Sequence, residues 1–524
     1  IMPWRKGVLI SAAPDILYAE DTNGDGVAEK TEILYSGFGT GNQQHRVNGF
    51  EWGLDNWIYL ANGSSGGKIG VKGGGKQVDI RGRDIRIQPD KLSVEAVAGQ
   101  SQFGRFQDNW GNWFGCNNPN PIFHFVLADH YLRRNPHLAA PASLRDILDG
   151  NRLVYPLAPV ISHCDTRIRP IGAPTIFTSA NSTTLYRDDL FGPSFSNITF
   201  TSEPVYNLVH RRRLIPDGVT FRSQRLESEP ATEFMRSSDP WFRPTRLKIG
   251  PDGALYVADM VREVIEHPEW IDDETEKQID VRAGHEFGRI YRVLPVGLKP
   301  RQPVRLDQLD TAGLVATLES PSGWQRDMAQ RMLIWQNNPE APGKLEIMAA
   351  DGVQPLARLH ALCTLDGLNK LKMETISIAL SDDHAGIRRH ALRLAEPYLN
   401  NKDRTFFSQL QLLCKDPDPH VVMQAGYSAA HLDPPLAGQI LGHLAIRHAD
   451  DPYISAAVLS SLNQANVNET LKVALGMDGQ EPTSGIVGFL STAAVICSDD
   501  SLADILQYIS QSIDGRFEDW QPTA

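Results

Sequence analysis

The chain is poor in the features that mark several common classes of protein. Among its 524 residues there are five cysteines, an odd number that includes no CxxC pair. Such scattered cysteines predict no disulfide framework, no zinc site and no attached c-type haem within this chain. Basic residues are in the minority, 51 against 63 acidic ones. The resulting net charge of −12 excludes a broad basic field for nucleic acid or anionic lipid.

Long apolar runs and leader patterns are missing as well. No stretch approaches the eighteen or more apolar residues of a membrane-spanning helix, and no signal-peptide pattern is present. The first residues, IMPWRKGVLISAAPDILYAE, begin without methionine and alternate like a strand from the start. We therefore expect the chain to be a piece that begins inside a domain.

Two enzyme signatures are also absent. The glycine clusters between Gly63 and Gln77 lack the GxxxxGK[ST] pattern and do not precede a helix, so they predict a surface loop instead of a phosphate-binding loop. The GxSxG pattern is missing too, which disfavours a hydrolase of the serine type.

The first informative feature is an acidic loop, DTNGDGVAEKTE, at residues 21–32. Asp, Asn and Asp alternate, a glycine follows, and a glutamate closes a twelve-residue frame, which is the spacing of a calcium loop. An Asx-rich turn without a metal is the alternative. The predicted ligands are Asp21, Asn23, Asp25, Val27, Glu29 and Glu32.

Residues 1–296 carry a recurring hairpin phrase that predicts a β-propeller. WGLDNWIYLANG, DNWGNWFGCNN and IGPDGALYVADM each place a Gly/Asp/Asn turn between two strand patterns. Repeated small sheets of this kind predict propeller blades, and we expect six, the first of them truncated. A β-sandwich with long loops is the alternative. The uneven spacing predicts a large insertion within residues 117–170.

The second part of the chain has helical periodicity. We expect a linker at 297–310 and a helical domain at 311–524. A small-residue position recurs at intervals of 30 to 34 residues, which is typical of a HEAT-like α-solenoid. These positions are Ala329, Ala361, Ala391, Ala425 and Ala457.

Several long segments carry a family resemblance. They are GFGTGNQQHRVNGFEWGLDNWIYLANG, SEPVYNLVHR, DPWFRPTRLKIGPDGALYVADMVREVIEHPEW and RAGHEFGRIYRV. The chain resembles the membrane-bound-dehydrogenase-type, PVC-type haem-binding proteins of planctomycetes. Their propeller is similar to the sorbosone and glucose dehydrogenases that use pyrroloquinoline quinone (PQQ). The resemblance implies HEAT-like repeats and a cytochrome c domain that lies, with part of the first blade, outside this chain.

The resemblance also implies site residues. The catalytic-histidine motif of the sugar dehydrogenases matches His45, Gly49, Gly53, Asp55, Tyr59 and Gly63. His45 is the implied base, while Ser64 stands where that motif has an acidic residue. Because the quinone carries three carboxylates, we expect cations and neutral donors around it. The implied cofactor-binding residues are Arg46, Asn48, Gln102, Arg105, Arg246, Asp259 and Arg262. Ion pairs between blades are the alternative role for the arginines of FRPTRL and GRIYRV, among them Arg246, Arg289 and Arg292.

The leading functional hypothesis is a calcium-stabilised, PQQ-dependent dehydrogenase that oxidises a sugar or alcohol and passes electrons to a cytochrome. A non-catalytic scaffold that binds carbohydrate or protein, and a metal-dependent lactonase, are the alternatives. A ring of arginines near His45 would favour the dehydrogenase, and several central carboxylates the lactonase. The resemblance implies a periplasmic or cell-envelope location.

Overall fold

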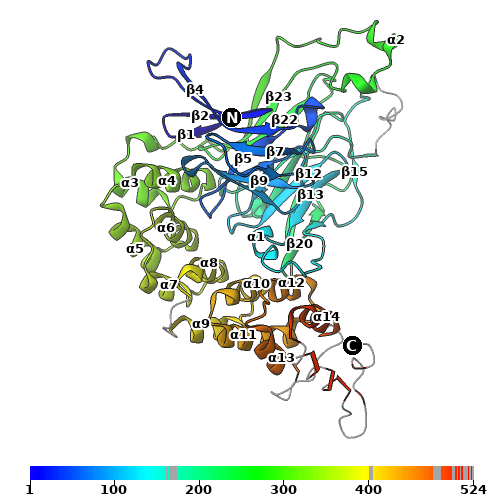
Figure 1. The fold of residues 1–524 in the computed structure, drawn as a ribbon. Coiled ribbons are helices and arrows are strands. Elements are labelled where there is room, and N and C mark those ends of the chain that lie inside the picture. Colours follow the sequence, from blue (N-terminus) through cyan, green and yellow to red (C-terminus); the bar gives the residue numbers. More distant parts are fainter. Residues whose placement is uncertain are drawn as a thin grey trace. The chain divides into compact units, whose positions relative to one another are not determined.

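A computed structural model shows a part built of strands and a part built of helices (Figure 1). It describes residues 1–160, 163, 174–399, 405–475 and 486–498, together with short pieces between 502 and 521. The chain forms two compact units. The first comprises residues 1–125 and 144–341, and the second comprises residues 126–143 and 342–524.

The strands of the first unit form five antiparallel propeller blades. Blade 1 contains β1 (Met2–Trp4), β2 (Gly7–Ala12), β3 (Asp15–Glu20), β4 (Lys30–Phe38), β7 (Gly67–Val71) and β8 (Val78–Asp79). Blade 2 contains β5 (Asn48–Trp52), β6 (Ile58–Ala61), β9 (Asp84–Gln88) and β10 (Ser93–Val97). Blade 3 contains β11 (Arg105–Gln107), β12 (Trp113–Asn117), β13 (Asn120–Phe125) and β14 (Leu144–Asp146).

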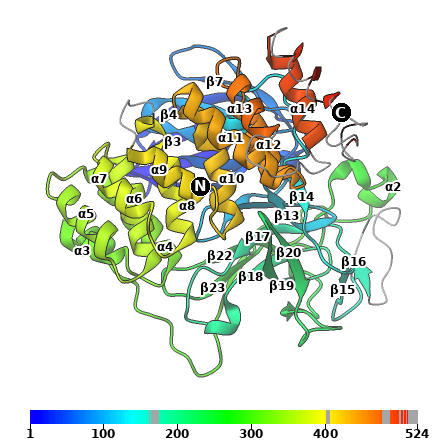
Figure 2. The ribbon, with the colours of Figure 1, turned by 90° about the horizontal axis from the view of Figure 1, so that it is seen from below.

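The remaining blades follow in chain order. Blade 4 contains β17 (Asn181–Leu185), β18 (Ile198–Glu203), β19 (Leu208–Asp217), β20 (Thr220–Arg225) and β21 (Met235–Arg236). Blade 5 contains β22 (Pro244–Ile249), β23 (Leu255–Asp259) and β24 (Arg289–Val293). The first strands of neighbouring blades contact one another, β5 with β11, β11 with β17 and β17 with β22. Figure 2 shows β17 to β20 beside β22 and β23.

The propeller is confirmed, but the described residues form five blades where six were predicted. Between β14 and β17, the described residues pair as the short strands β15 (Leu153–Val154) and β16 (Thr175–Ile176). The predicted insertion has a definite place, because residues 126–143 leave blade 3 between β13 and β14 and pack in the second unit.

The recurring phrase builds the same turn in two blades. In blade 2, Asp55 accepts the backbone N–H of Trp57 at 3.3 Å and the hydroxyl of Tyr59 at 2.8 Å. In blade 5, Asp252 accepts the N–H of Ala254 at 3.1 Å and the hydroxyl of Tyr256 at 2.9 Å. The aspartate therefore closes the hairpin and ties it to the second strand.

Three α-helices of the described residues lie within the propeller unit, the single turn α2 (Asp273–Glu276) and the longer α3 (Thr311–Thr317) and α4 (Gly323–Gln336). The hairpins β5–β6, β11–β12, β17–β18 and β22–β23 all join a first strand to a second one, so they gather at one end of the propeller. Four side chains of α4 bond to these hairpins, and α4 therefore covers that end. The bonds join Gln325 to Pro251, Arg326 to Asn109, Asp327 to Arg187 and Gln330 to Asn56.

The second unit is a stack of helices in the described residues. It contains α1 (Asp129–Leu132), α5 (Ala341–Asp351), α6 (Pro355–Gly367), α7 (Met373–Ala379), α8 (Ala385–Ala395), α9 (Thr405–Leu413), α10 (Pro419–Ser428), α11 (Pro434–His448), α12 (Pro452–Ser460), α13 (Val467–Ala474) and α14 (Ile486–Ile496). In Figure 2, α6, α8, α10 and α12 follow one another, as their contacts require. None of the described helices is long and apolar enough to cross a membrane.

The repeat predicted from the alanines is present. Ala329 lies in α4, and Ala361, Ala391, Ala425 and Ala457 lie in α6, α8, α10 and α12, all with no exposed surface. Alanine fits there because a larger side chain would separate the stacked helices. A second repeat runs alongside: Arg358 pairs with Asp382, and Arg388 pairs with Asp416, each through two bonds of 2.7 and 2.8 Å.

Candidate functional site

Two neighbouring cavities lie where the first strands begin, away from the hairpins that α4 covers. The aromatic cavity has a volume of about 480 Å³ and the arginine cavity about 610 Å³. Gln44 and Phe103 line both, so the two cavities share a wall. The aromatic cavity is otherwise lined mainly by Asn118, Phe177, Thr178, Ser179, Asn181, Thr245, Met260, Glu266, His267 and Trp270. The arginine cavity is lined mainly by Ser11, Gln43, Arg46, Val47, Asn48, Gly49 and Phe50.

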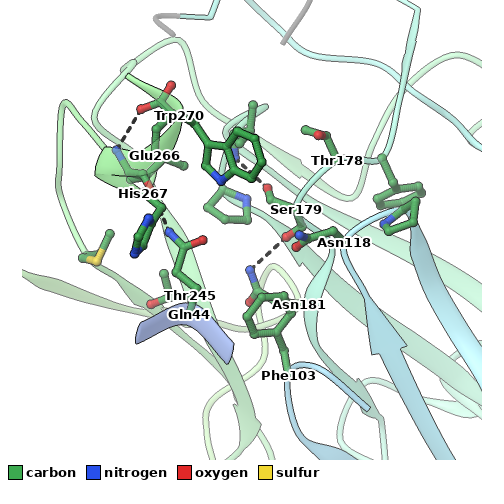
Figure 3. Close-up of a pocket in the computed structure, with 16 residues that line it drawn as sticks. Gln44, Phe103, Asn118, Thr178, Ser179, Asn181, Thr245, Glu266, His267 and Trp270 are labelled. Carbon is green, nitrogen blue, oxygen red and sulfur yellow. Dashed lines mark hydrogen bonds between the residues drawn. The ribbon is translucent and has the colours of Figure 1, made fainter. Parts of the chain in front are cut away.

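The aromatic cavity combines three aromatic rings with short polar side chains. Figure 3 shows Glu266, His267 and Gln44 on one side and Ser179, Asn118 and Asn181 on the other. No arginine or lysine lines it in the described residues. Aromatic faces with amide and hydroxyl groups suit an uncharged ligand that has several hydroxyls.

Hydrogen bonds from Asn181 and Glu203 hold the segment that carries Ser179. Asn181 donates from Nδ2 to the carbonyl of Ser179 at 3.1 Å. Glu203, which is fully buried, accepts the backbone N–H groups of Thr178 at 3.1 Å and of Ser179 at 2.9 Å. Burial raises the pKa of Glu203 to about 7, and the hydrogen bonds oppose that rise.

The arginine cavity brings together some of the predicted cofactor ligands. Arg46 donates to the carbonyl of Thr40 at 2.8 Å, while its Nε is buried without a hydrogen-bond partner. Asn48 donates from Nδ2 to the carbonyls of Arg46 and Gln102, both at 2.9 Å. No carboxylate lines this cavity in the described residues.

Arg246 adds a second guanidinium next to this cavity. Gly49 lines the cavity and has a φ of +73°, and a Cβ at Gly49 would lie 2.5 Å from Cα of Gly104. A Cβ at Gly104 would in turn lie 3.1 Å from Nη1 of Arg246. The two glycines thus leave room for this guanidinium. Burial lowers the pKa of Arg246, and the nearby Glu51 opposes that shift. In the described residues, the side chain of Arg246 forms no hydrogen bond or ion pair.

His45 ends a short 3-10 helix, η1 (Gln43–His45), whose Gln44 lines both cavities. Its backbone N–H donates to Asn42 at 3.0 Å, and its carbonyl accepts from Ser65 at 3.1 Å. The imidazole is half-buried. Gly63, at φ +75°, is required here because a Cβ would lie 2.5 Å from the carbonyl oxygen of His45. His45 adjoins residues that line the cavities, Gln44 and Arg46, without being among those residues itself.

Four other predicted cofactor residues line neither cavity. The side chain of Gln102 accepts the backbone N–H of Asn118 at 3.2 Å. Arg105 pairs with the buried Asp84 at 3.1 Å and lies 3.8 Å above the ring of Phe125. Asp259 accepts from Arg243 N–H at 2.8 Å and from Arg289 at 2.9 Å.

Arg262 donates to backbone carbonyls between residues 260 and 287. Arg105, Asp259 and Arg262 are thus engaged by contacts within the propeller. Their predicted role in cofactor binding stays a prediction.

The acidic loop gathers part of its predicted ligand set. Carboxylate oxygens of Asp21, Asp25 and Glu29 lie within 4.8 Å of one another, and Nδ2 of Asn23 contacts Glu29 at 2.6 Å. Glu32 lies elsewhere: it is part of β4 and bonds to Lys72. The acidic group therefore ends at Glu29 and does not reach Glu32, the last residue of the predicted twelve-residue loop. Glu32 is separated from the group because β4 begins at Lys30, so that Glu32 is a residue of the strand.

The comparisons with known proteins add a family. Residues 1–297, more than half of the chain, match the family described as "Domain of unknown function (DUF7133)". The chain belongs to this family. No curated protein matches it. A solved structure of an engineered protein matches with 14% identity and a TM-score of 0.24, over 39% of this chain and 64% of that one. The match thus spans less than two thirds of the engineered protein, and it is too weak to bear on the fold.

Within the DUF7133 domain, several cavity residues were missed at the sequence level. Phe177, Ser179 and Trp270 lie in loops far apart in the chain and carry no recognised spacing. Trp270 stands in the EHPEW segment, where an isolated tryptophan in a polar loop is the one available signal. Glu203 gives no signal, because a glutamate in a strand pattern reads as solvent-exposed.

Proposed function

We propose that this chain binds a sugar or related polyhydroxylated alcohol in the aromatic cavity and an anionic quinone, pyrroloquinoline quinone, in the arginine cavity, and that it oxidises the first with the second. One observation carries the proposal. Two cavities of different chemistry share a wall made by Gln44 and Phe103, so two ligands of different charge would lie side by side.

The donor set of the arginine cavity supports an anionic ligand. A quinone with three carboxylates needs cations that are not already paired. Arg46 has a buried Nε without a partner, and Arg246 forms no ion pair in the described residues. Asn48 adds a neutral side chain, and no carboxylate lines the cavity in the described residues. Such a quinone supplies a two-electron acceptor when it is bound.

The aromatic cavity supports a neutral sugar. Trp270, Phe103 and Phe177 offer apolar faces for the C–H surfaces of a pyranose, and Asn118, Thr178 and Asn181 offer hydrogen bonds to its hydroxyls. Glu266 lines the same cavity, so an acidic sugar would meet a like charge there.

His45 is the proposed base. Oxidation of an alcohol carbon requires removal of the hydroxyl proton as the C–H hydrogen leaves with its electrons, and a neutral imidazole takes up such a proton near neutral pH. His45 lies in the chain between Gln44, which lines both cavities, and Arg46, which lines the arginine cavity. Gly63 and Ser65 hold its backbone there.

The acidic loop is proposed to hold calcium as a structural ion. Carboxylates of Asp21, Asp25 and Glu29, together with the carbonyl of Val27, are the hard oxygen ligands that calcium prefers. The loop connects β3 to β4, so a bound ion would stiffen the edge of blade 1. Calcium is abundant outside the cytosol, and the proposed location is therefore the periplasm or cell envelope. A cytochrome c domain or protein would accept the electrons there.

A non-catalytic carbohydrate-binding scaffold is the second candidate. It is favoured by the engagement of Arg105, Asp259 and Arg262 in the blades, which leaves two guanidiniums near the cavity instead of a ring. A lactonase has less support, because the acidic group that could hold a metal in the described residues is the exposed loop.

The test is a titration of the full chain, loaded with calcium, with pyrroloquinoline quinone, followed by its absorbance. We expect saturable binding that Arg46→Ala and Arg246→Ala each weaken, while the exposed Arg81→Ala leaves it unchanged. Aldoses and alcohols are then added to the loaded protein, and reduction of the quinone should disappear in His45→Ala. Sugar binding without quinone binding would refute the oxidation and favour the scaffold.

A further inference from the structure

The Ser179 side of the aromatic cavity rests on a carboxyl group that does not itself line the cavity. Glu203 ends β18 with no exposed surface. Its Oε2 accepts two backbone N–H groups, and its Oε1 accepts the hydroxyl of Ser179. Within the described residues, no lysine or arginine pairs with it. A buried carboxyl group held by neutral donors alone, beside a ligand cavity, is an unusual arrangement for a purely structural side chain.

The hydroxyl of Ser179 has a limited number of hydrogen bonds to offer. It carries one hydrogen and two lone pairs. The hydrogen is donated to Glu203, and one lone pair accepts the N–H of Val205 at 3.2 Å. One lone pair is left for a ligand. With Glu203 ionised, Ser179 therefore meets a ligand only as a hydrogen-bond acceptor.

Protonation of Glu203 reverses this role. A neutral carboxyl group donates its own hydrogen to Ser179, so both lone pairs of the hydroxyl are occupied by Glu203 and Val205. The hydroxyl hydrogen of Ser179 is then released toward the cavity that this residue lines (Figure 3). Ser179 becomes a donor to the ligand.

We infer that Glu203 is a positioning residue that determines specificity in the aromatic cavity, because it sets whether Ser179 accepts a hydrogen bond from a bound sugar or donates one to it. The inference rests on the proposed function, since it takes the ligand to be a sugar. Burial raises the pKa of Glu203 to about 7, so both forms of the carboxyl group are populated near neutral pH.

Other titratable groups lie near this side of the cavity, and their titration has to be distinguished from that of Glu203. Burial, and to a smaller extent the charge of Glu203, raise the pKa of Tyr206. Glu266 and His267 line the cavity opposite Ser179. His163 bonds through its backbone to Glu266, and the buried pair His210 and Glu233 lies behind Phe177. Among the described residues that line the cavity, His267 is the one histidine, and His267→Gln is therefore the matched control.

The first measurement needs no ligand. The carboxyl carbon of Glu203 is followed by NMR in protein labelled with 13C at glutamate, between pH 4 and 9, with Glu203→Gln to assign the signal. We expect a midpoint near neutral pH that moves upward in Ser179→Ala, because the carboxylate loses a donor. A midpoint below pH 5, or one that Ser179→Ala leaves in place, would overturn the inference.

The second measurement titrates the wild type and the variants with glucose and maltose between pH 5.5 and 8.5. The wild-type affinity should change by about three- to tenfold across the Glu203 midpoint, the equivalent of one hydrogen bond. Ser179→Ala and Glu203→Gln should lose this dependence, and His267→Gln should keep it. A Ser179→Ala protein with wild-type pH dependence would contradict the inference. Absence of sugar binding in every protein would instead contradict the proposed function, and the NMR titration would still decide the coupling of Glu203 to Ser179.

Discussion

A single tyrosine in the segment that leaves blade 3 should control the stability of the helical unit. Tyr131 lies in α1 with 4% of its surface exposed, and its ring stacks on that of Tyr427 with centroids 4.3 Å apart. Its hydroxyl donates to Oε1 of Glu396 at 2.7 Å and accepts from Gln424 at 3.1 Å. All four residues belong to the same compact unit.

Replacement of Tyr131 by alanine removes a buried aromatic ring. Losses of this kind destabilise by about 3–5 kcal/mol. Tyr131→Phe keeps the ring and removes the donor to Glu396, which still receives hydrogen bonds from Gln424 and Ser428. We therefore expect a smaller loss for Tyr131→Phe, about 1 kcal/mol.

Urea unfolding followed by circular dichroism at 222 nm measures these losses, because that signal comes mainly from the helices. The control is His137→Ala, an exposed residue in the same segment, which should leave the midpoint unchanged. A Tyr131→Ala protein whose helices unfold at the wild-type urea concentration would refute the packing argument. Equal losses for alanine and phenylalanine would show that the hydrogen bond, and not the ring, carries the stability.

Three further predictions concern other parts of the chain. Ala425→Leu in α10 should lower the free energy of unfolding, measured with a chemical denaturant, by about 1–3 kcal/mol, because the stacked helices leave no room for the larger side chain. Ala425→Gly adds no atoms and should therefore not cause this steric loss. Removal of calcium by a chelator should lower the melting temperature of the wild type and have no effect on Asp21→Asn if that carboxylate is a ligand. The pKa of Glu203 is raised in the folded state, so the free energy of unfolding should fall by about 3 kcal/mol as pH rises from about 4.5 to about 7. Unfolding measured at several pH values tests this dependence, which Glu203→Gln should remove.

Local features of the fold were readable from the sequence because they depend on residues close in the chain. The hairpin phrase around Asp55 and Asp252 predicts its own turn, since the aspartate bonds to groups two and four residues away. The thirty-residue spacing of Ala361 and Ala391 predicts stacked helix pairs for the same reason. The described residues form five blades where six were predicted, because the sequence between β14 and β17 does not reveal that its described part pairs as the short strands β15 and β16.

The candidate site was less accessible to sequence reasoning. Asn48 bonds to the carbonyls of Arg46 and Gln102, and Arg246 adjoins the same cavity, while the role of these residues in cofactor binding stays a prediction. Arg105 was expected in the same set, but its charge is matched by Asp84, a residue 21 positions earlier in the chain. Whether an arginine faces a cavity or pairs within a blade depends on such distant partners, which leave no trace in local composition.

The sequence by itself determined the two kinds of architecture, the hairpin turns, the helical repeat and the acidic loop, since each follows from spacing along the chain. Only the tertiary structure decided that Glu29 and not Glu32 approaches Asp21, that residues 126–143 pack with the helices, and that Glu203 supports the wall of a cavity. These outcomes depend on which distant surfaces meet. Burial, hydrogen bonding and charge are then set by neighbours in space, and a buried carboxyl group acquires its properties from groups that the chain brings to it on folding.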